Sequence, residues 1–254
     1  VTQTAASNFA GLALTKTGNG TLVLGGSNSF GGLNINGGIV SVSADANLGD
    51  TVQNSTVTIG TGFAGLALAP NPGVLRITES FDTSRIITNS SVTSPGVIDI
   101  AAGKTLMMRG ALSSVAASTS GLFKTGAGTL ALQSTASYSL FNLNQGALHL
   151  TGGASSLPTA VSTTNLNGGL LQMTAFGTAV YGSATNSTFN YQGGARVLLT
   201  ANSGGQATLA ALAVNRTANT NGTLVLEVGS GFTLGVNAAN GVRFTSTNLD
   251  GAAI

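Results

Sequence analysis

The sequence predicts an all-β protein with the architecture of a right-handed parallel β-helix, or β-solenoid. Three observations lead to this prediction: short segments alternate between apolar and polar residues, clusters of glycine and asparagine separate them, and a unit of 29 residues occurs twice. Threonine, serine, asparagine and glycine supply most of the polar residues, and these types favour strands and tight turns over helices. No convincing amphipathic helix of ten residues is present.

The alternating segments are three to five residues long and mark the expected strands. A period of two indicates a strand with one buried and one exposed face. Such segments lie at residues 21–24, 33–36, 40–43, 56–59, 74–77, 129–132, 148–150 and 224–228. Turn-forming clusters, such as those at 25–28 and 167–169, separate them.

Internal repetition favours a solenoid over a sandwich or a barrel, which short strands alone would also allow. Residues 14–42 align without a gap on residues 122–150, and twelve of the 29 positions are identical. Alternate positions that differ keep their apolar character, as where Val40 aligns with Leu148. A strand with one buried face requires this pattern.

We expect one solenoid domain over residues 1–254. Copies of the unit lie near residues 14–49 and 122–157, and a degenerate copy lies near 214–250. Glycine and asparagine would form the corners of each coil, and parallel strands would stack at about 4.8 Å per coil. With about 22 residues per coil, the chain would form about eleven or twelve coils and a rod of about 55 Å.

Three segments of the unit carry a resemblance to a known family: LTKTGNGTLVL at 14–24, GGIVSVSAD at 37–45 and KTGAGTL at 124–130. The unit resembles the autotransporter-associated β-strand repeat. Residues 84–86, 96–100 and 103–106 also resemble the rungs between such repeats. The resemblance implies a right-handed parallel β-helix at the surface of a bacterial cell, built from repeats that carry no catalytic residues.

Charge is scarce, and this limits the partners that we expect. Nine basic and seven acidic residues give a net charge of +2, and the basic residues are scattered along the chain. Without a basic stripe interleaved with aromatic residues, we expect no nucleic-acid binding. No run of about 18 apolar residues occurs, so we expect no transmembrane segment. No signal peptide opens the sequence, which indicates a mature product or an excised segment.

Few residues are candidates for catalysis, and we predict that the chain is not an enzyme. His149 is the single histidine; alternation directs it outward between Leu148 and Leu150, as a solvated surface residue and not a catalytic base. We expect Asp82 and Arg85 to form a local ion pair near a turn and not a catalytic acid and base. The remaining acids are spread along the chain, although they could converge in space. We assign no catalytic, cofactor-binding or metal-binding residue and expect no cofactor.

Two lysines and one glycine-rich segment recur in the repeat without indicating a catalytic site. Lys16 and Lys124 occupy the same repeat position, and we expect each stem to cover apolar surface at the edge of a coil. An isopeptide link from a lysine to an asparagine is the alternative. Residues 126–131 fit the pattern Gly-x-Gly-x-x-Ala, but they precede an expected strand, so we interpret them as a turn and not as a dinucleotide site.

Two classes of function are consistent with these features. The first is a structural extracellular protein at the bacterial cell surface: a rigid fibre, a filament subunit or an adhesin stalk. The alternative is a secreted β-helix that binds or cleaves carbohydrate, for which cleavage would need suitably placed carboxylates. The chain has no tryptophan and only 13 aromatic residues. The single local group, Tyr181, Phe189 and Tyr191, is expected to pack a cap or an insertion.

The two ends of the sequence are nearly uncharged and compatible with strands. A parallel β-helix has open edges that template further strands. We therefore predict self-association end to end through the terminal coils, a head-to-tail contact that would generate a filament. Continuation of the rod in a longer chain is the alternative. A surface glycan or a host receptor remains open as a further partner.

Overall fold

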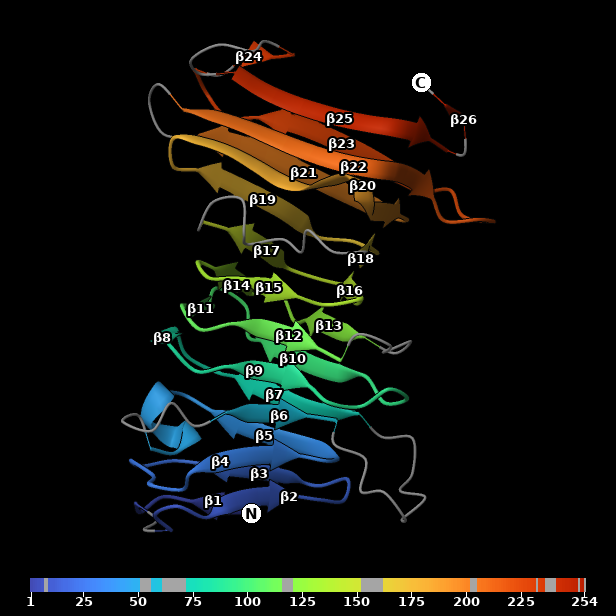
Figure 1. Cartoon of the computed structure of the whole chain (residues 1–254). Coiled ribbons are helices and arrows are strands. Elements are labelled where there is room, and N and C mark those ends of the chain that lie inside the picture. Colours follow the sequence, from blue (N-terminus) through green and yellow to red (C-terminus); the bar gives the residue numbers. More distant parts are fainter. Residues whose placement is uncertain are drawn as a thin grey trace.

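The computed structural model shows a stack of short parallel strands that rises from the N-terminal to the C-terminal coils (Figure 1). The structure describes residues 1–6, 9–50, 56–60, 72–115, 121–151, 162–201, 205–231, 233–235, 241–250 and 252–253. The predicted all-β fold and the predicted parallel β-helix are confirmed. All eight segments of alternating residues lie in or overlap strands. The expected repeat positions 152–157, 232 and 236–240 lie outside the described residues.

The strands form three sheets, which we call sheets 1, 2 and 3. In spatial order, sheet 1 contains β1 (Thr2–Gln3), β3 (Thr21–Leu24), β5 (Gly38–Val42), β7 (Gly73–Ile77), β10 (Gly96–Ile100), β13 (Leu122–Thr125), β16 (Leu140–Leu143), β18 (Ser162–Leu166), β20 (Thr178–Tyr191), β22 (Gln206–Arg216), β25 (Gly241–Leu249) and β24 (Thr233–Leu234), with β26 (Ala252–Ala253) antiparallel to β25. Sheet 2 contains β23 (Thr223–Val228), β21 (Gly194–Ala201), β19 (Leu170–Ala175), β17 (Ala147–Leu150), β14 (Thr129–Leu132), β11 (Thr105–Met108) and β8 (Phe81–Thr83). Sheet 3 contains β15 (Ala136–Ser137), β12 (Leu112–Ser114), β9 (Ile87–Asn89), β6 (Val57–Ile59), β4 (Gly32–Ile35) and β2 (Ala13–Lys16).

The chain visits the three sheets in turn, so the middle of the rod has a three-sided coil. From β7 to β16 the order is sheet 1, sheet 2, sheet 3 and back to sheet 1. Sheet 1 stacks eleven strands from β1 to β25, in agreement with the expected number of coils. Coil length varies: 18 residues separate the paired residues Thr21 and Ile39, whereas 35 separate Gly38 and Gly73.

Side chains that point into the coils form one continuous apolar core. The core cluster extends from Leu24 to Val242, and most of its members are less than 3% exposed. A 3₁₀ helix, η1 (Asp45–Leu48), packs at the side of the N-terminal coils and buries Leu48. Within the described residues, no helix has the length and apolar character needed to cross a membrane.

The C-terminal strands of sheet 1 are longer than the others. β20, β22 and β25 have 14, 11 and 9 residues, whereas the earlier strands of this sheet have two to five. The pairing of β20 with β22 shifts register between Ser183 and Thr188. These longer strands make the upper part of the rod wider in Figure 1.

The two copies of the repeated unit lie on different sides of the rod. In the first copy, β2 and β4 belong to sheet 3, and β3 and β5 belong to sheet 1. In the second copy, the corresponding strands β13 and β16 belong to sheet 1, and β14 and β17 belong to sheet 2. Each copy therefore contains two pairs of strands, and each pair turns between the same two sheets: sheets 3 and 1 in the first copy, and sheets 1 and 2 in the second.

Candidate functional site

Two rows of side-chain amides run along the outer face of sheet 1 in its C-terminal half. In row 1, Asn142, Asn165, Asn190 and Asn215 are in register on four neighbouring strands. Each Nδ2 donates to the Oδ1 of the preceding asparagine, over 2.8, 2.9 and 3.4 Å. Alternation directs these amides outward, because residues on either side, such as Leu166, belong to the core.

Row 2 lies two residues farther along the chain, at the positions that directly follow the ends of β16, β18 and β20. Asn167 Nδ2 donates to Asn144 Oδ1 over 2.8 Å, and Gln192 Nε2 donates to Asn167 Oδ1 over 3.0 Å. Thr217 continues this row on the next coil, where its backbone N–H donates to Tyr191 O. The two rows are about 6.6 Å apart, the advance of two residues in a strand.

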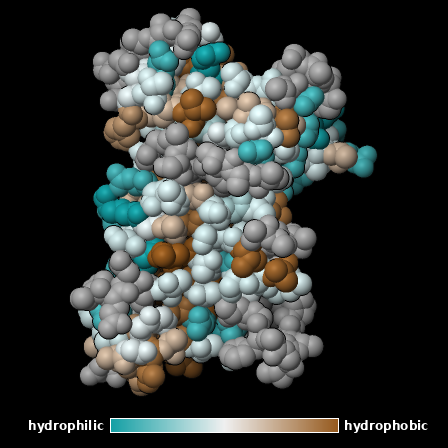
Figure 2. All heavy atoms as spheres, viewed as in Figure 1, coloured by the Kyte–Doolittle hydropathy of each residue, from teal (hydrophilic) through white to brown (hydrophobic). Residues whose placement is uncertain are grey.

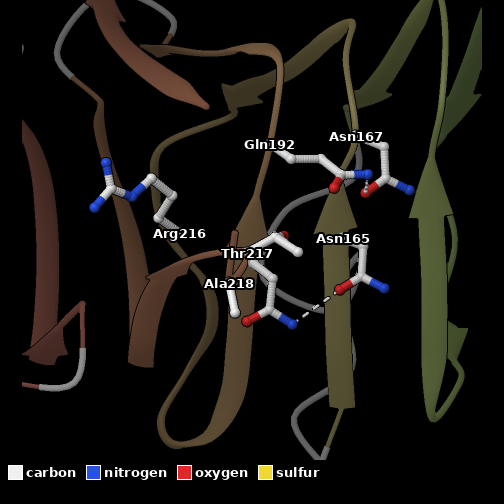
Figure 3. A pocket seen from close by; sticks show the side chains of 7 residues that line it. Asn165, Asn167, Gln192, Arg216, Thr217 and Ala218 are labelled. Carbon is white, nitrogen blue, oxygen red and sulfur yellow. Dashed lines mark hydrogen bonds between the residues drawn. The ribbon is translucent and has the colours of Figure 1, made fainter. Parts of the chain in front are cut away.

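A groove follows the rows where the chain leaves β22. Amides of both rows line it together with Arg216, Thr217 and Ala218, and its volume is about 480 Å³. Figure 3 shows Asn165, Asn167 and Gln192 facing this space, whereas the Arg216 guanidinium points away from the amides. The surface that the amides present is thus polar but uncharged.

A second groove of about 770 Å³ adjoins the first and is bounded by the turn at residues 217–221 and by Asp250. The Asp250 carboxylate accepts hydrogen bonds from the Tyr191 hydroxyl and from the Arg216 backbone N–H. Burial and the adjacent carboxylate both raise the pKa of Tyr191. These contacts hold the wall of the groove against β20.

Ion pairs in the described residues join neighbouring coils instead of gathering in one place. The five pairs are Arg76–Asp99, Arg85–Asp45, Lys104–Glu79, Arg109–Asp82 and Arg196–Glu227. No group of three or more metal-ligating side chains occurs among the residues that the structure describes. On the face drawn in Figure 2, the strongly hydrophilic and the strongly hydrophobic areas are small and lie among residues of intermediate hydropathy.

The expected ion pair between Asp82 and Arg85 is wrong. Asp82 points outward from β8 and binds Arg109 of the next coil at 2.6 Å. Arg85 is only 2% exposed and binds Asp45 at 2.9 Å. Its guanidinium also donates to Gly49 O and Asp50 O, over 2.8 and 3.0 Å. The two residues are close in sequence, but they point to different sides of their coil.

Lys16 and Lys124 use their ammonium groups to hold the corners of the repeat. Lys124 Nζ donates to the carbonyl oxygens of Thr125, Gly126 and Gln145, and Lys16 makes the equivalent three bonds in the first copy. Lys124 is fully buried, and burial lowers its pKa to about 8. The expectation that the stems merely cover apolar surface is therefore corrected. An isopeptide link remains an untested alternative.

Comparison with known families identifies the repeated unit. The profile of the passenger-associated-transport-repeat matches residues 14–42 and 122–139. Both copies are similar to this transport repeat. The predicted resemblance to an autotransporter repeat is confirmed for these residues, and the name of the repeat associates it with autotransporter passengers. Comparison with curated proteins and with solved structures gave no significant match.

His149 lies at an outward position of β17, as expected, but the imidazole is not fully solvated. Leu148 and Leu150 on either side are fully buried. His149 Nε2 is 2.9 Å from Thr174 Oγ1 of the next coil, and burial lowers the pKa of the histidine. The predicted glycine-rich turn is confirmed at 126–128, where Gly126 has φ of 70°, whereas residues 129–131 already belong to β14.

The aromatic group Tyr181, Phe189 and Tyr191 does not pack a cap or an insertion, so that prediction is wrong. All three residues lie on the single strand β20. Tyr181 and Phe189 are 0% and 3% exposed and belong to the core. The wider C-terminal coils need larger side chains to fill them, and these aromatic rings supply that volume.

The amide rows were not predicted from the sequence, although the sequence contains a signal for them. The asparagines of row 1 recur at intervals of 23, 25 and 25 residues, close to one coil each. The row begins at a repeat position, because Asn142 aligns with Asn34 of the first copy. Asn34 instead has Thr58 as its neighbour on the next strand, so only the C-terminal coils extend the row.

Proposed function

We propose that this chain is a rigid structural segment of a bacterial surface protein, serving as an adhesin stalk or a filament subunit without catalytic activity of its own. The observation that carries the proposal is that charged side chains pair between neighbouring coils. Each described ion pair joins neighbouring coils, and five of the seven acidic residues take part. Together with the continuous core, these pairs resist bending between coils.

The positions of the acidic residues give no comparable support to the alternative function, the cleavage of glycans. A retaining or inverting glycosidase needs two carboxyl groups at a set separation, with one of them protonated. Glu227 is held in an ion pair with Arg196 that lowers its pKa, which opposes a role as general acid. Asp82 and Asp99 are likewise engaged by arginines of neighbouring coils.

Rigidity can be measured directly, because the chain has no cysteine that would interfere with labelling. Spin labels at Ser27→Cys and Ser230→Cys, both exposed, would report the distance between distant coils by double electron–electron resonance. A stalk predicts one narrow distance distribution that persists at moderate urea concentrations. A broad distribution in buffer would contradict the proposal. Protease treatment of intact cells provides the independent test of surface exposure.

The proposal includes association of copies through their end coils. At the C-terminal end, Leu226 is in register with the buried Val197 but is 40% exposed. At the N-terminal end, Phe9 and Leu12 are 54% and 65% exposed. A second copy stacked head to tail would cover both groups with main-chain hydrogen bonds and apolar contacts.

Sedimentation velocity over a range of protein concentrations tests this association. We expect oligomers that grow with protein concentration and change little with salt concentration, because few charged side chains lie at the proposed contact between copies. Leu226→Glu should reduce them, whereas Val180→Glu, at a 45% exposed position on β20, should not. A single monomeric species at every concentration would exclude association through the ends.

A further inference from the structure

We infer that the two amide rows on sheet 1 form a binding track for an extended, uncharged β-1,4-linked oligosaccharide. This role does not depend on the proposed stalk function, because it uses a different surface of the rod. It rests on the chemistry of the amides, the spacing of the rows and a groove lining in which amide and hydroxyl groups predominate.

The amides retain hydrogen-bonding capacity after the rows have formed. A primary amide carries two N–H donors and an oxygen that accepts two hydrogen bonds. Within a row, an interior member such as Asn165 or Asn190 uses one N–H and one acceptor position. In the described part of the chain, one donor and one acceptor therefore remain on each of these amides, and both are half-exposed at the groove.

The spacing of these groups suits a sugar chain parallel to the rod axis. Neighbouring coils repeat at about 4.8 Å, and the rows are about 6.6 Å apart. A pyranose ring in an extended β-1,4 chain advances by about one coil and carries hydroxyl groups on both edges. Each hydroxyl donates and accepts, so one ring can bond Asn165 on one side and Asn167 on the other. The helical α-1,4 chain curves away from such a track.

The lining of the groove explains why the ligand should be uncharged. Its polar lining consists of amide and hydroxyl groups and Arg216, whose guanidinium points away from the amides (Figure 3). Asp250, in the adjoining groove, accepts hydrogen bonds from Tyr191 and from the backbone N–H of Arg216. A phosphate or uronate would thus meet no inward-directed cation, whereas a neutral hydroxyl-rich chain would meet donors and acceptors on successive coils.

The test uses the whole chain and isothermal titration calorimetry with cellohexaose, xylohexaose and mannohexaose as extended probes. Maltohexaose serves as the curved control, and a galacturonate hexamer serves as the charged control. We expect at least one extended neutral hexasaccharide to bind. Its dissociation constant should change less than twofold between low and high salt. No new reducing ends should appear.

Two double variants separate binding from stability. Asn190→Thr with Gln192→Thr removes one rung of both rows while keeping residues suited to a strand. Asn34→Thr with Asn36→Thr makes the same change at equivalent outward positions of sheet 3, away from the groove. Loss of about two hydrogen bonds should weaken binding about tenfold or more in the first variant, and less than twofold in the second. Thermal unfolding of both variants shows whether they fold.

Three outcomes would overturn the inference. The first is that none of the extended hexasaccharides binds at millimolar concentration. The second is that both double variants bind as tightly as the original chain. The third is that maltohexaose or the charged hexamer binds at least as tightly as the extended neutral probes.

Discussion

Replacing Arg85 by methionine should destabilise the protein far more than the same change at Arg109. Both arginines bind an aspartate of a neighbouring coil, but their surroundings differ. The side chain of Arg85 is 2% exposed and that of Asp45 is 26% exposed, whereas Arg109 and Asp82 are 50% and 57% exposed. The two arginines therefore provide a matched comparison of a buried and an exposed ion pair.

The expected magnitude follows from the partners of Arg85. Its guanidinium satisfies one carboxylate of Asp45 and the carbonyl oxygens of Asp45, Gly49 and Asp50. Methionine would fill the space but leave these acceptors without a donor. Breaking a buried ion pair in this way costs about 3–5 kcal/mol. The exposed pair of Arg109 contributes about 0–1 kcal/mol, because water and salt screen it.

Urea unfolding followed by circular dichroism and by tyrosine fluorescence would measure both losses. Coincident transitions would justify a two-state analysis. We also expect Arg85→Met to open the segment around η1 to proteases before the rest of the rod unfolds. A loss below about 1 kcal/mol for Arg85→Met, or equal losses for the two variants, would refute this reasoning.

Two further predictions concern the corners of the repeat. Because burial lowers the pKa of Lys124 from 10.5 to about 8, the unfolded chain holds this proton to higher pH, so the free energy of unfolding should rise between about pH 8 and 10. Lys124→Met should remove this rise in urea midpoints; a wild-type stability that falls over this range would contradict the cause. Gly146→Ala should cost about 1–3 kcal/mol more than Gly103→Ala, since both glycines have positive φ but only a Cβ at Gly146 would clash with Gly128 O. Equal losses of stability in the two variants, measured by thermal or urea unfolding, would show that the backbone at the corner moves to accommodate the added methyl group.

The strands could be predicted from the sequence because the alternation of apolar and polar residues within each strand shows which of its side chains are buried. In β3 and β14, alternate leucines face one core, so the pattern is visible within four residues. Inter-coil partners could not be predicted in the same way. Arg85 and Asp45 are 40 residues apart, and coils of variable length hide which residues become neighbours.

The amide rows of the candidate site could not be predicted from the sequence for a related reason. Asparagine is common in this chain, and it is typical of turns, so its presence at Asn165 or Asn190 carries little information alone. Only the pairing of β18 with β20 shows that these residues stack. The aromatic group on β20 was wrongly assigned to a cap or an insertion because clustering in the sequence does not distinguish these from a wide core.

The placement of the two copies of the repeated unit on different corners affects how such a rod could acquire binding surfaces. An outward residue of the unit faces sheet 3 at Asn34 but sheet 1 at Asn142. Duplicating the unit would thus rotate its outward residues to another side of the rod instead of repeating them in line. A straight track along one side must then arise from coils outside these two copies, as the later asparagines on β18, β20 and β22 illustrate.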